Sequence, residues 1–127
     1  MVSVADSRRA LAPIARRFYG SPADELRMIG VTGTNGKSTT VGLIGQLLDA
    51  GGHSTAVVGT LGASLGEIQL AATERTTPES TDLAPILRRA SEAGASAVAM
   101  EVSSHALMQE RVAGLEYQVA VWTNLTR

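Results

Sequence analysis

The sequence predicts an α/β fold in which a mainly parallel sheet, with helices on both faces, carries a P-loop for phosphate. Two observations support this fold class. Short runs rich in Val, Ile and Ala alternate with longer segments of helical periodicity. A glycine-rich stretch containing Lys37 joins the first of these runs to the helical segment after it. Such alternation is typical of parallel strands with helical crossovers, whose ligands bind at the carboxyl ends of the strands.

The elements follow from the positions of apolar residues and of chain breakers. We expect strands at residues 26–32, 54–59, 97–102 and 117–123, and a hairpin at residues 61–71 that turns around Gly62 to Gly66. We expect helices at residues 7–18, 37–50 and 103–110. A further helix should be capped by Ser80 or Thr81 and run to residue 93. The predicted inward residues are Ala10, Leu11, Ile14, Ala15 and Phe18, then Val41, Ile44, Leu47 and Leu48, and finally Leu83, Ile86, Leu87 and Ala90.

Composition excludes several classes of protein. The chain has 127 residues, of which 44% are hydrophobic and 18% are charged, as in an ordinary globular domain. The absence of cysteine excludes disulfides and thiolate metal sites. A net charge of -1 does not indicate a nucleic-acid partner. No apolar run is long enough for a membrane span and the first ten residues lack a signal core, so we expect no membrane partner and a cytoplasmic location.

The strongest functional signal lies between the first predicted strand and the helix after it. Glycines at positions 30, 33 and 36 are followed by Lys37 and Ser38. Backbone N–H groups of such a loop converge on phosphate oxygens, the lysine reaches the terminal phosphates and the hydroxyl serves Mg²⁺. Val31 stands where the general pattern has its first glycine, and the alternative is a glycine-rich turn with a surface lysine. Lys37 is the only lysine in the chain, which favours the phosphate role.

Two other polar clusters follow predicted elements. Residues 76–80 precede a helix and, on their chemistry alone, fit a loop with a helix cap. Glu101 comes at the carboxyl end of an apolar strand, on the same edge as the phosphate loop, where a carboxylate suits a hard cation such as Mg²⁺. A partly exposed glutamate in a helix-capping cluster is the alternative.

The stretch Gly33-Thr-Asn-Gly-Lys-Ser38 resembles the ATP-binding loop of the Mur ligase superfamily, which folylpolyglutamate synthases and cyanophycin synthetases share in close versions. Residues 76–80, 99–111 and 121–127 are similar to the UDP-N-acetylmuramoyl-tripeptide synthetase (MurE) branch. The resemblance covers nearly all of residues 2–127. Ser38 stands where many relatives have Thr, and Trp122 stands where the family often has Phe.

The resemblance implies a set of site residues. Lys37 and Glu101 would be catalytic, and Ser38 and Glu101 would hold Mg²⁺. ATP would be bound by Gly33, Thr34, Asn35, Gly36, Lys37, Ser38 and Thr39, with Asn124 near the nucleotide. The UDP-N-acetylmuramoyl-dipeptide would be contacted by Thr76, Thr77, Ser103, Gln109 and Arg111.

The resemblance also implies a reaction, in which ATP activates the D-Glu carboxylate of UDP-N-acetylmuramoyl-L-Ala-D-Glu and a diamino acid, meso-diaminopimelate or L-Lys, forms the amide. This step belongs to peptidoglycan precursor synthesis. Residues 1–24 would be a linker helix after an N-terminal domain, and residues 25–127 part of the central ATP-binding domain. We expect the full-length protein to be monomeric and this chain alone to be inactive. A non-catalytic nucleotide-binding fragment, or a ligase of the folate or cyanophycin type, remains an alternative.

Overall fold

The computed structural model describes residues 1–125 and contains one six-stranded sheet in the order β4-β3-β2-β5-β1-β6. β1 pairs in parallel with β5 and β6, and β2 pairs in parallel with β5, whereas β3 and β4 form an antiparallel hairpin beside β2. The strands are β1 (Arg27–Thr32), β2 (Thr55–Gly59), β3 (Gly62–Leu65), β4 (Ile68–Ala71), β5 (Ala97–Glu101) and β6 (Val119–Trp122). The predicted α/β class is therefore confirmed.

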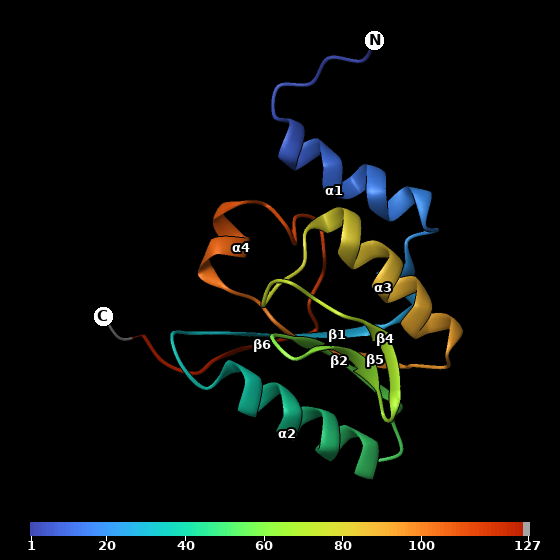
Figure 1. The fold of residues 1–127 in the computed structure, drawn as a ribbon, viewed down its shortest axis with the longest axis vertical. Helices are drawn as coiled ribbons and strands as arrows, with labels where there is room; N and C mark the ends of the chain where they lie inside the picture. The colour runs from blue at the N-terminus through green and yellow to red at the C-terminus, as the bar shows by residue number, and fades with distance from the viewer. Residues whose placement is uncertain (126–127) are drawn as a thin grey trace.

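Helices cover both faces of this sheet (Figure 1). α2 (Lys37–Ala50) lies on one face, and α3 (Ser80–Glu92) lies on the other, with α1 (Ser7–Phe18) packed outside it. α4 (Ser104–Met108) and the short 3₁₀ turn η1 (Pro22–Glu25) complete the fold. This order places the carboxyl ends of β1, β2 and β5 at one edge of the sheet, where parallel sheets of this kind bind ligands.

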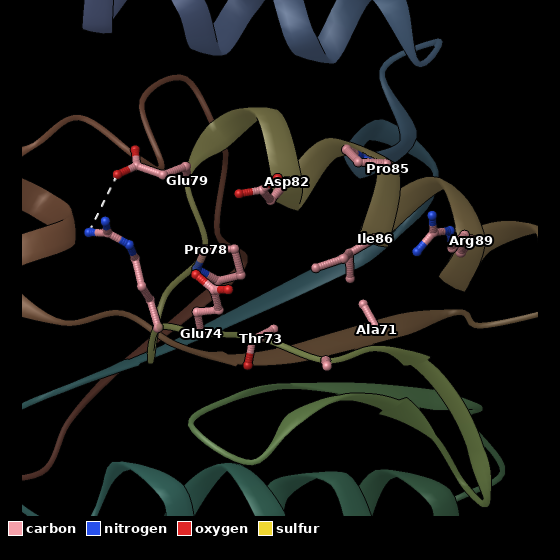
Figure 2. A pocket seen from close by; sticks show the side chains of 11 residues that line it. Ala71, Thr73, Glu74, Pro78, Glu79, Asp82, Pro85, Ile86 and Arg89 are labelled. Atoms are coloured by element: carbon pink, nitrogen blue, oxygen red, sulfur yellow. Dashed lines mark ion pairs between the residues drawn. The ribbon is translucent and has the colours of Figure 1, made fainter.

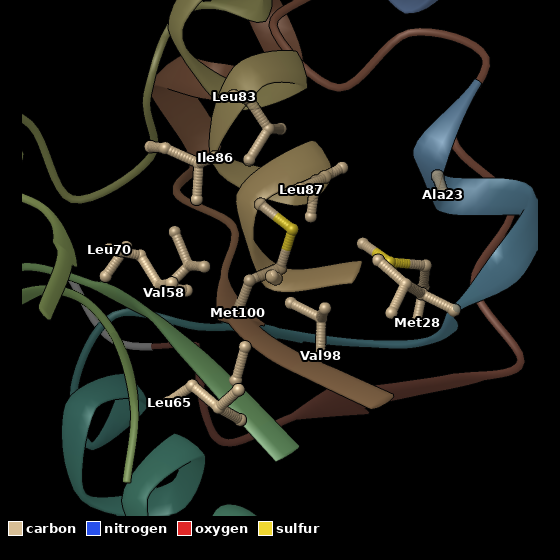
Figure 3. Packing of buried hydrophobic residues seen from close by; sticks show 14 of the residues in the cluster. Ala23, Met28, Val58, Leu65, Leu70, Leu83, Ile86, Leu87, Val98 and Met100 are labelled. Atoms are coloured by element: carbon tan, nitrogen blue, oxygen red, sulfur yellow. The ribbon is translucent and has the colours of Figure 1, made fainter. Parts of the chain in front are cut away.

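The main core lies between the sheet and α3 (Figure 3). Leu83, Ile86, Leu87 and Ala90 are all buried there, which confirms the inward stripe predicted for this helix. Met28, Val98 and Met100 face them from β1 and β5. The Tyr117 ring covers Gly30, where an added Cβ would lie 2.9 Å from a ring carbon. Burial raises the pKa of Tyr117, and its hydroxyl donates to Met100 Sδ at 3.4 Å.

Two of the predicted inward stripes are wrong in part. In α1, Leu11, Ile14 and Phe18 are exposed, and the buried residues are Ala12 and Ala15. α1 packs on α3 rather than on the sheet, and small residues allow two helices to approach closely.

α2 departs from its predicted stripe at one position. Leu47 is 73% exposed, while Val41 and Gly45 are buried. An added Cβ at Gly45 would lie 2.9 Å from Val57 Cγ2, so α2 packs against β2 through its glycine.

Smaller differences concern the ends of elements. α3 has Glu79 at its N-cap without a side-chain hydrogen bond, so the predicted cap at Ser80 or Thr81 is wrong. The remaining strands and helices lie within about two or three residues of their predicted bounds, the usual scatter of helix and strand ends. The predicted hairpin is present as β3 and β4, but its turn is at Gly66–Glu67, because residues 62–65 form β3. Residues 126 and 127, the last of the 121–127 resemblance, lie outside the described residues. Within residues 1–125, every helix is too short or too polar to cross a membrane.

We expect Leu87→Ala to lower the free energy of unfolding by about 2–5 kcal/mol, because it opens a cavity in the main core. Leu87 is 1% exposed, whereas Leu43 on α2 is 54% exposed and serves as the matched control. Leu43→Ala should cost less than about 1 kcal/mol. Urea unfolding followed by circular dichroism measures both values, and equal losses would contradict the assignment of the core to this face.

Candidate nucleotide and metal site

The predicted phosphate loop runs from the end of β1 to the start of α2. Gly33 and Gly36 have φ angles of 136° and 86°, which favour glycine. Gly36 is the N-cap of α2 and makes no side-chain hydrogen bond to the first N–H groups of the helix, and such uncapped N–H groups can bind phosphate. A pocket of about 250 Å³ adjoins this helix end and is lined by Thr34, Asn35, Gly36, Lys37, Ser38, Thr39, Thr60, Thr76 and Glu101.

Lys37 is the first residue of α2, and its ammonium group folds back over the loop. Nζ donates to the carbonyl oxygens of Gly33 at 2.8 Å and Thr34 at 3.5 Å. Lys37 also lines the pocket, and a lysine beside a phosphate loop can supply the positive charge that the terminal phosphates of a nucleotide need.

Glu101 is the last residue of β5, and its side chain is buried although it carries a carboxylate. Oε1 accepts from Ser38 Oγ at 2.9 Å, so the predicted metal residues of the phosphate loop and of β5 meet. An ionised buried carboxylate needs several donors, because its desolvation is costly. The sequence prediction that these two side chains share one edge of the sheet is consistent with this contact.

The remaining donors to Glu101 come from Thr60, which the sequence analysis missed. Thr60 N–H donates to Glu101 Oε2 at 2.6 Å, and Thr60 Oγ1 donates to Oε1 at 3.4 Å. A Cβ added at Gly59 would lie 1.9 Å from Oε2, so the carboxylate occupies the space that glycine leaves open. A hydroxyl residue directly after a predicted strand was the available signal, because that strand ends at the same edge.

The two threonines of the predicted substrate loop have different surroundings. Thr76 lines the pocket, and its hydroxyl is hydrogen-bonded to Thr60 Oγ1 at 3.1 Å. Thr77 is fully buried, and its hydroxyl donates to the Glu101 carbonyl oxygen at 2.9 Å and accepts from Ser103 N–H at 3.0 Å. Their predicted contacts with the muramoyl-peptide remain predictions.

The other predicted substrate residues lie around α4. Ser103 caps this helix, and its Oγ accepts from Ala106 N–H at 3.1 Å. Arg111 is buried and donates to the Thr77 carbonyl oxygen at 3.0 Å and to Gln109 Oε1. Its Nε also lies 3.4 Å from Glu79 Oε1. Arg111 thus contacts Gln109 directly and is linked to Ser103 through Thr77. The substrate contacts of these residues remain predictions.

Asn124 contacts the phosphate loop from the end of β6. Its Oδ1 accepts from Asn35 N–H at 3.1 Å, and its Nδ2 donates to the Asn35 carbonyl oxygen at 3.0 Å. The neighbouring Thr123 Oγ1 donates to the same carbonyl at 2.7 Å. An added Cβ at Gly33 would lie 2.1 Å from Thr123 Oγ1, so this glycine also permits the contact between loop and strand. Thr123 is a second residue that the sequence analysis missed.

A second cavity, of about 390 Å³, is bordered by the loop that carries the two threonines (Figure 2). Glu74 and Glu79 border it from the loop, and Asp82, Ile86 and Arg89 border it from α3. Arg75 Nη1 lies 3.7 Å from Glu79 Oε1, the ion pair drawn in Figure 2. The loop at residues 72–79 therefore borders both this cavity and the phosphate pocket.

Within the described part of the chain, no three His, Cys, Asp or Glu side chains cluster as a metal-binding group. A cation at the phosphate loop would accordingly rely on Glu101, Ser38 and the oxygens of its ligand and of water, which is how Mg²⁺ is usually held beside a nucleotide.

The family model of the Mur ligase middle domain matches residues 31–127. The chain belongs to the Mur ligase family. A UDP-N-acetylmuramoyl-L-alanyl-D-glutamate--2,6-diaminopimelate ligase from Geobacillus kaustophilus is 49% identical over all 127 residues, and one from Syntrophomonas wolfei is 45% identical over the same length. A solved structure of a ligase with the same name superposes with a TM-score of 0.86 at 34% identity over 99% of this chain.

This Mur ligase chain spans only part of its relatives. It covers 26% of the length of each of the two ligases and 26% of the solved chain. The comparisons confirm the resemblance to the tripeptide synthetase branch that the three sequence motifs indicated, and they agree with the observed fold.

The close contact between Gly59 and the Glu101 carboxylate predicts that a methyl group added at Gly59 disturbs the site. Gly59→Ala should displace the carboxylate and weaken the affinity for Mg²⁺ and ATP by at least about tenfold, equivalent to roughly 1.4 kcal/mol. Isothermal titration of the protein from the complete gene gives the affinity. Gly42→Ala is the matched control, because no atom lies within 4 Å of a Cβ at that helical position. Parental affinity in Gly59→Ala would show that the carboxylate has no part in binding.

Proposed function

We propose that this chain forms the ATP-binding part of a ligase that joins 2,6-diaminopimelate to UDP-N-acetylmuramoyl-L-Ala-D-Glu. The names of relatives that are 45% and 49% identical to the chain support the two substrates. The contact between Ser38 and Glu101 beneath the phosphate loop carries the proposal, because it brings a hydroxyl and a carboxylate to the end of a helix that can bind phosphate.

The residues at this site fit Mg²⁺. This cation prefers oxygen ligands and keeps several waters when it is bound with a nucleotide. Ser38 Oγ and Glu101 Oε1 are both hard oxygen atoms, 2.9 Å apart, and Thr60 N–H holds the second carboxylate oxygen at 2.6 Å. When bound, Mg²⁺ would neutralise part of the charge on the β- and γ-phosphates of ATP.

The residues of the chain would then act mainly by positioning. The N–H groups at the start of α2 would bind the phosphates, and Lys37 would move from the Gly33 carbonyl oxygen to the terminal phosphates. The γ-phosphoryl group would pass to the D-Glu carboxylate of the muramoyl-dipeptide. The amine of the diamino acid would attack the resulting acyl phosphate, and phosphate would leave.

The acceptor substrate would approach the phosphate pocket from the side of Thr76. Thr76 lines that pocket beside Thr60 and Glu101, so an acceptor carboxylate bound there would lie close to the terminal phosphate. Ser103, Gln109 and Arg111 would contact the muramoyl-peptide farther from the phosphate loop, and Asn124 would hold the loop near the nucleotide.

We also propose that residues 1–24 form a linker and residues 25–127 part of the central domain of a longer, monomeric, cytoplasmic enzyme. The 26% coverage of the relatives supports this, because the other contacts with uridine and with the amino acid would come from the remainder of such a protein. The 127-residue chain by itself should bind ATP at most weakly and should not ligate.

Lys37→Ala in the protein from the complete gene should lower the rate of tripeptide formation by on the order of 100-fold or more, as expected for a lost charge contact in phosphoryl transfer. The assay contains ATP, Mg²⁺, the UDP-muramoyl-dipeptide and diaminopimelate, and the product is identified by mass spectrometry.

Arg17→Ala, which removes an exposed cation from α1, is the control and should keep the parental rate. A Lys37→Ala rate within about threefold of the parent, under roughly 1 kcal/mol of barrier, would refute the assignment.

A further inference from the structure

The hydroxyl group of Thr77 is inaccessible to any ligand in the phosphate pocket. Thr77 is 0% exposed, although it lies in a loop directly after Thr76, which lines that pocket. Its hydroxyl has two partners inside the protein: it donates to the Glu101 carbonyl oxygen and accepts from the Ser103 N–H group. A single hydroxyl in this place is therefore the hydrogen-bond partner of two main-chain groups.

Both of these main-chain groups belong to the point where β5 ends. Glu101 is the last residue of the strand, and the Val102 N–H group donates to the Val31 carbonyl oxygen of β1 at 2.8 Å. The Thr77 hydroxyl holds Glu101 and Ser103, the residues before and after Val102. The direction of the Glu101 side chain follows from its main chain, so Thr77 helps to determine where the carboxylate lies.

Thr77 is held in turn by the group around α4. Arg111 Nη1 donates to the Thr77 carbonyl oxygen at 3.0 Å, and Arg111 is itself buried against Gln109 and Glu79. A continuous set of hydrogen bonds therefore runs from Arg111 through Thr77 and the main chain of Glu101 to Ser38 on the phosphate loop.

We propose that the Thr77 hydroxyl is a positioning group for the Glu101 carboxylate and makes no contact with substrate, whereas Thr76 faces the reactants. The inference rests on the metal site proposed above. Two neighbouring threonines thus have separate roles: one hydroxyl is directed into the pocket, and the other secures the end of the strand that carries the cation ligand.

Thr77→Val tests this, because valine keeps the shape of threonine and removes the hydroxyl. In the protein from the complete gene, Mn²⁺ is titrated in the presence of a non-hydrolysable ATP analogue and followed by electron paramagnetic resonance. The Mn²⁺ affinity should fall about tenfold or more, since the Glu101 carbonyl oxygen and the Ser103 N–H group lose their shared partner. The KM for the UDP-muramoyl-dipeptide should change less than about twofold, and Thr77→Ser, which restores the hydroxyl, should recover parental Mn²⁺ affinity.

Thr81→Val, at an exposed threonine on α3, is the matched control and should leave both quantities unchanged. A raised KM for the dipeptide with parental Mn²⁺ affinity would overturn the inference and make the hydroxyl a substrate contact. A lower melting temperature with both quantities unchanged would overturn it too, leaving a purely structural role. If Thr77→Val does not fold, Thr77→Cys replaces it, because a thiol is a weaker hydrogen-bonding group than a hydroxyl. Its Mn²⁺ affinity should fall and its KM for the dipeptide should stay at the parental value, and the opposite result would overturn the inference.

Failure of the proposed function would look different. A parent protein that makes no tripeptide would refute the ligase assignment, whereas the inference about Thr77 is decided by the Mn²⁺ titration in a parent that does make it.

Discussion

The carboxylate of Glu101 is the constraint around which this end of the molecule is arranged. A charged group that is only 3% exposed must be given donors, or its desolvation destabilises the fold. Ser38 supplies one from the first turn of α2, and Thr60 supplies its N–H and hydroxyl from the end of β2. These donors can meet because β1, β2 and β5 are parallel neighbours whose carboxyl ends share one edge.

The same constraint explains a glycine that has no part in the phosphate loop. Gly59 ends β2, and a methyl group there would overlap Glu101 Oε2. Gly30 and Gly33 are restricted in the same way, by the Tyr117 ring and by Thr123 Oγ1. Of the three glycines that the sequence motif contains, therefore, one serves packing behind the sheet and one serves the contact with β6. Gly36, which has no neighbour near its missing Cβ, leaves the helix end open.

The sequence predicted the buried residues of a helix best where the helix packs directly on the sheet and apolar periodicity alone decides which side chains are buried. The period of α3 predicted Leu83, Ile86 and Leu87 as core residues because this helix lies directly on the sheet. The rule failed for α1, whose alanines pack on another helix while Phe18 remains exposed. Apolar periodicity shows that a helix has a preferred face, but the partner element decides whether large or small side chains are buried.

In the candidate site too, the sequence predicts the features that depend on neighbouring residues and misses those that depend on contacts between distant segments. Lys37, Ser38 and Glu101 could be named from motifs, because each lies at a strand end or helix start that the sequence reveals. The opposite directions of Thr76 and Thr77 could not, since they depend on where the loop at residues 72–79 crosses the end of β5.

That crossing connects the two halves of the site. The loop borders the phosphate pocket through Thr76 and the second cavity through Glu79, and its buried Thr77 joins the main chain of Glu101 to Arg111. Two hydrogen bonds therefore link Arg111 to the residue that carries the carboxylate: Arg111 donates to the Thr77 carbonyl oxygen, and the Thr77 hydroxyl donates to the Glu101 carbonyl oxygen. Ser38 and Arg111, which lie more than sixty residues apart in the sequence, thus belong to one connected set of hydrogen bonds. Under the proposed function, this loop would hold the Glu101 carboxylate through Thr77 and would present Thr76 to the acceptor, so one segment would help to place both of the reactants that phosphoryl transfer must hold in line.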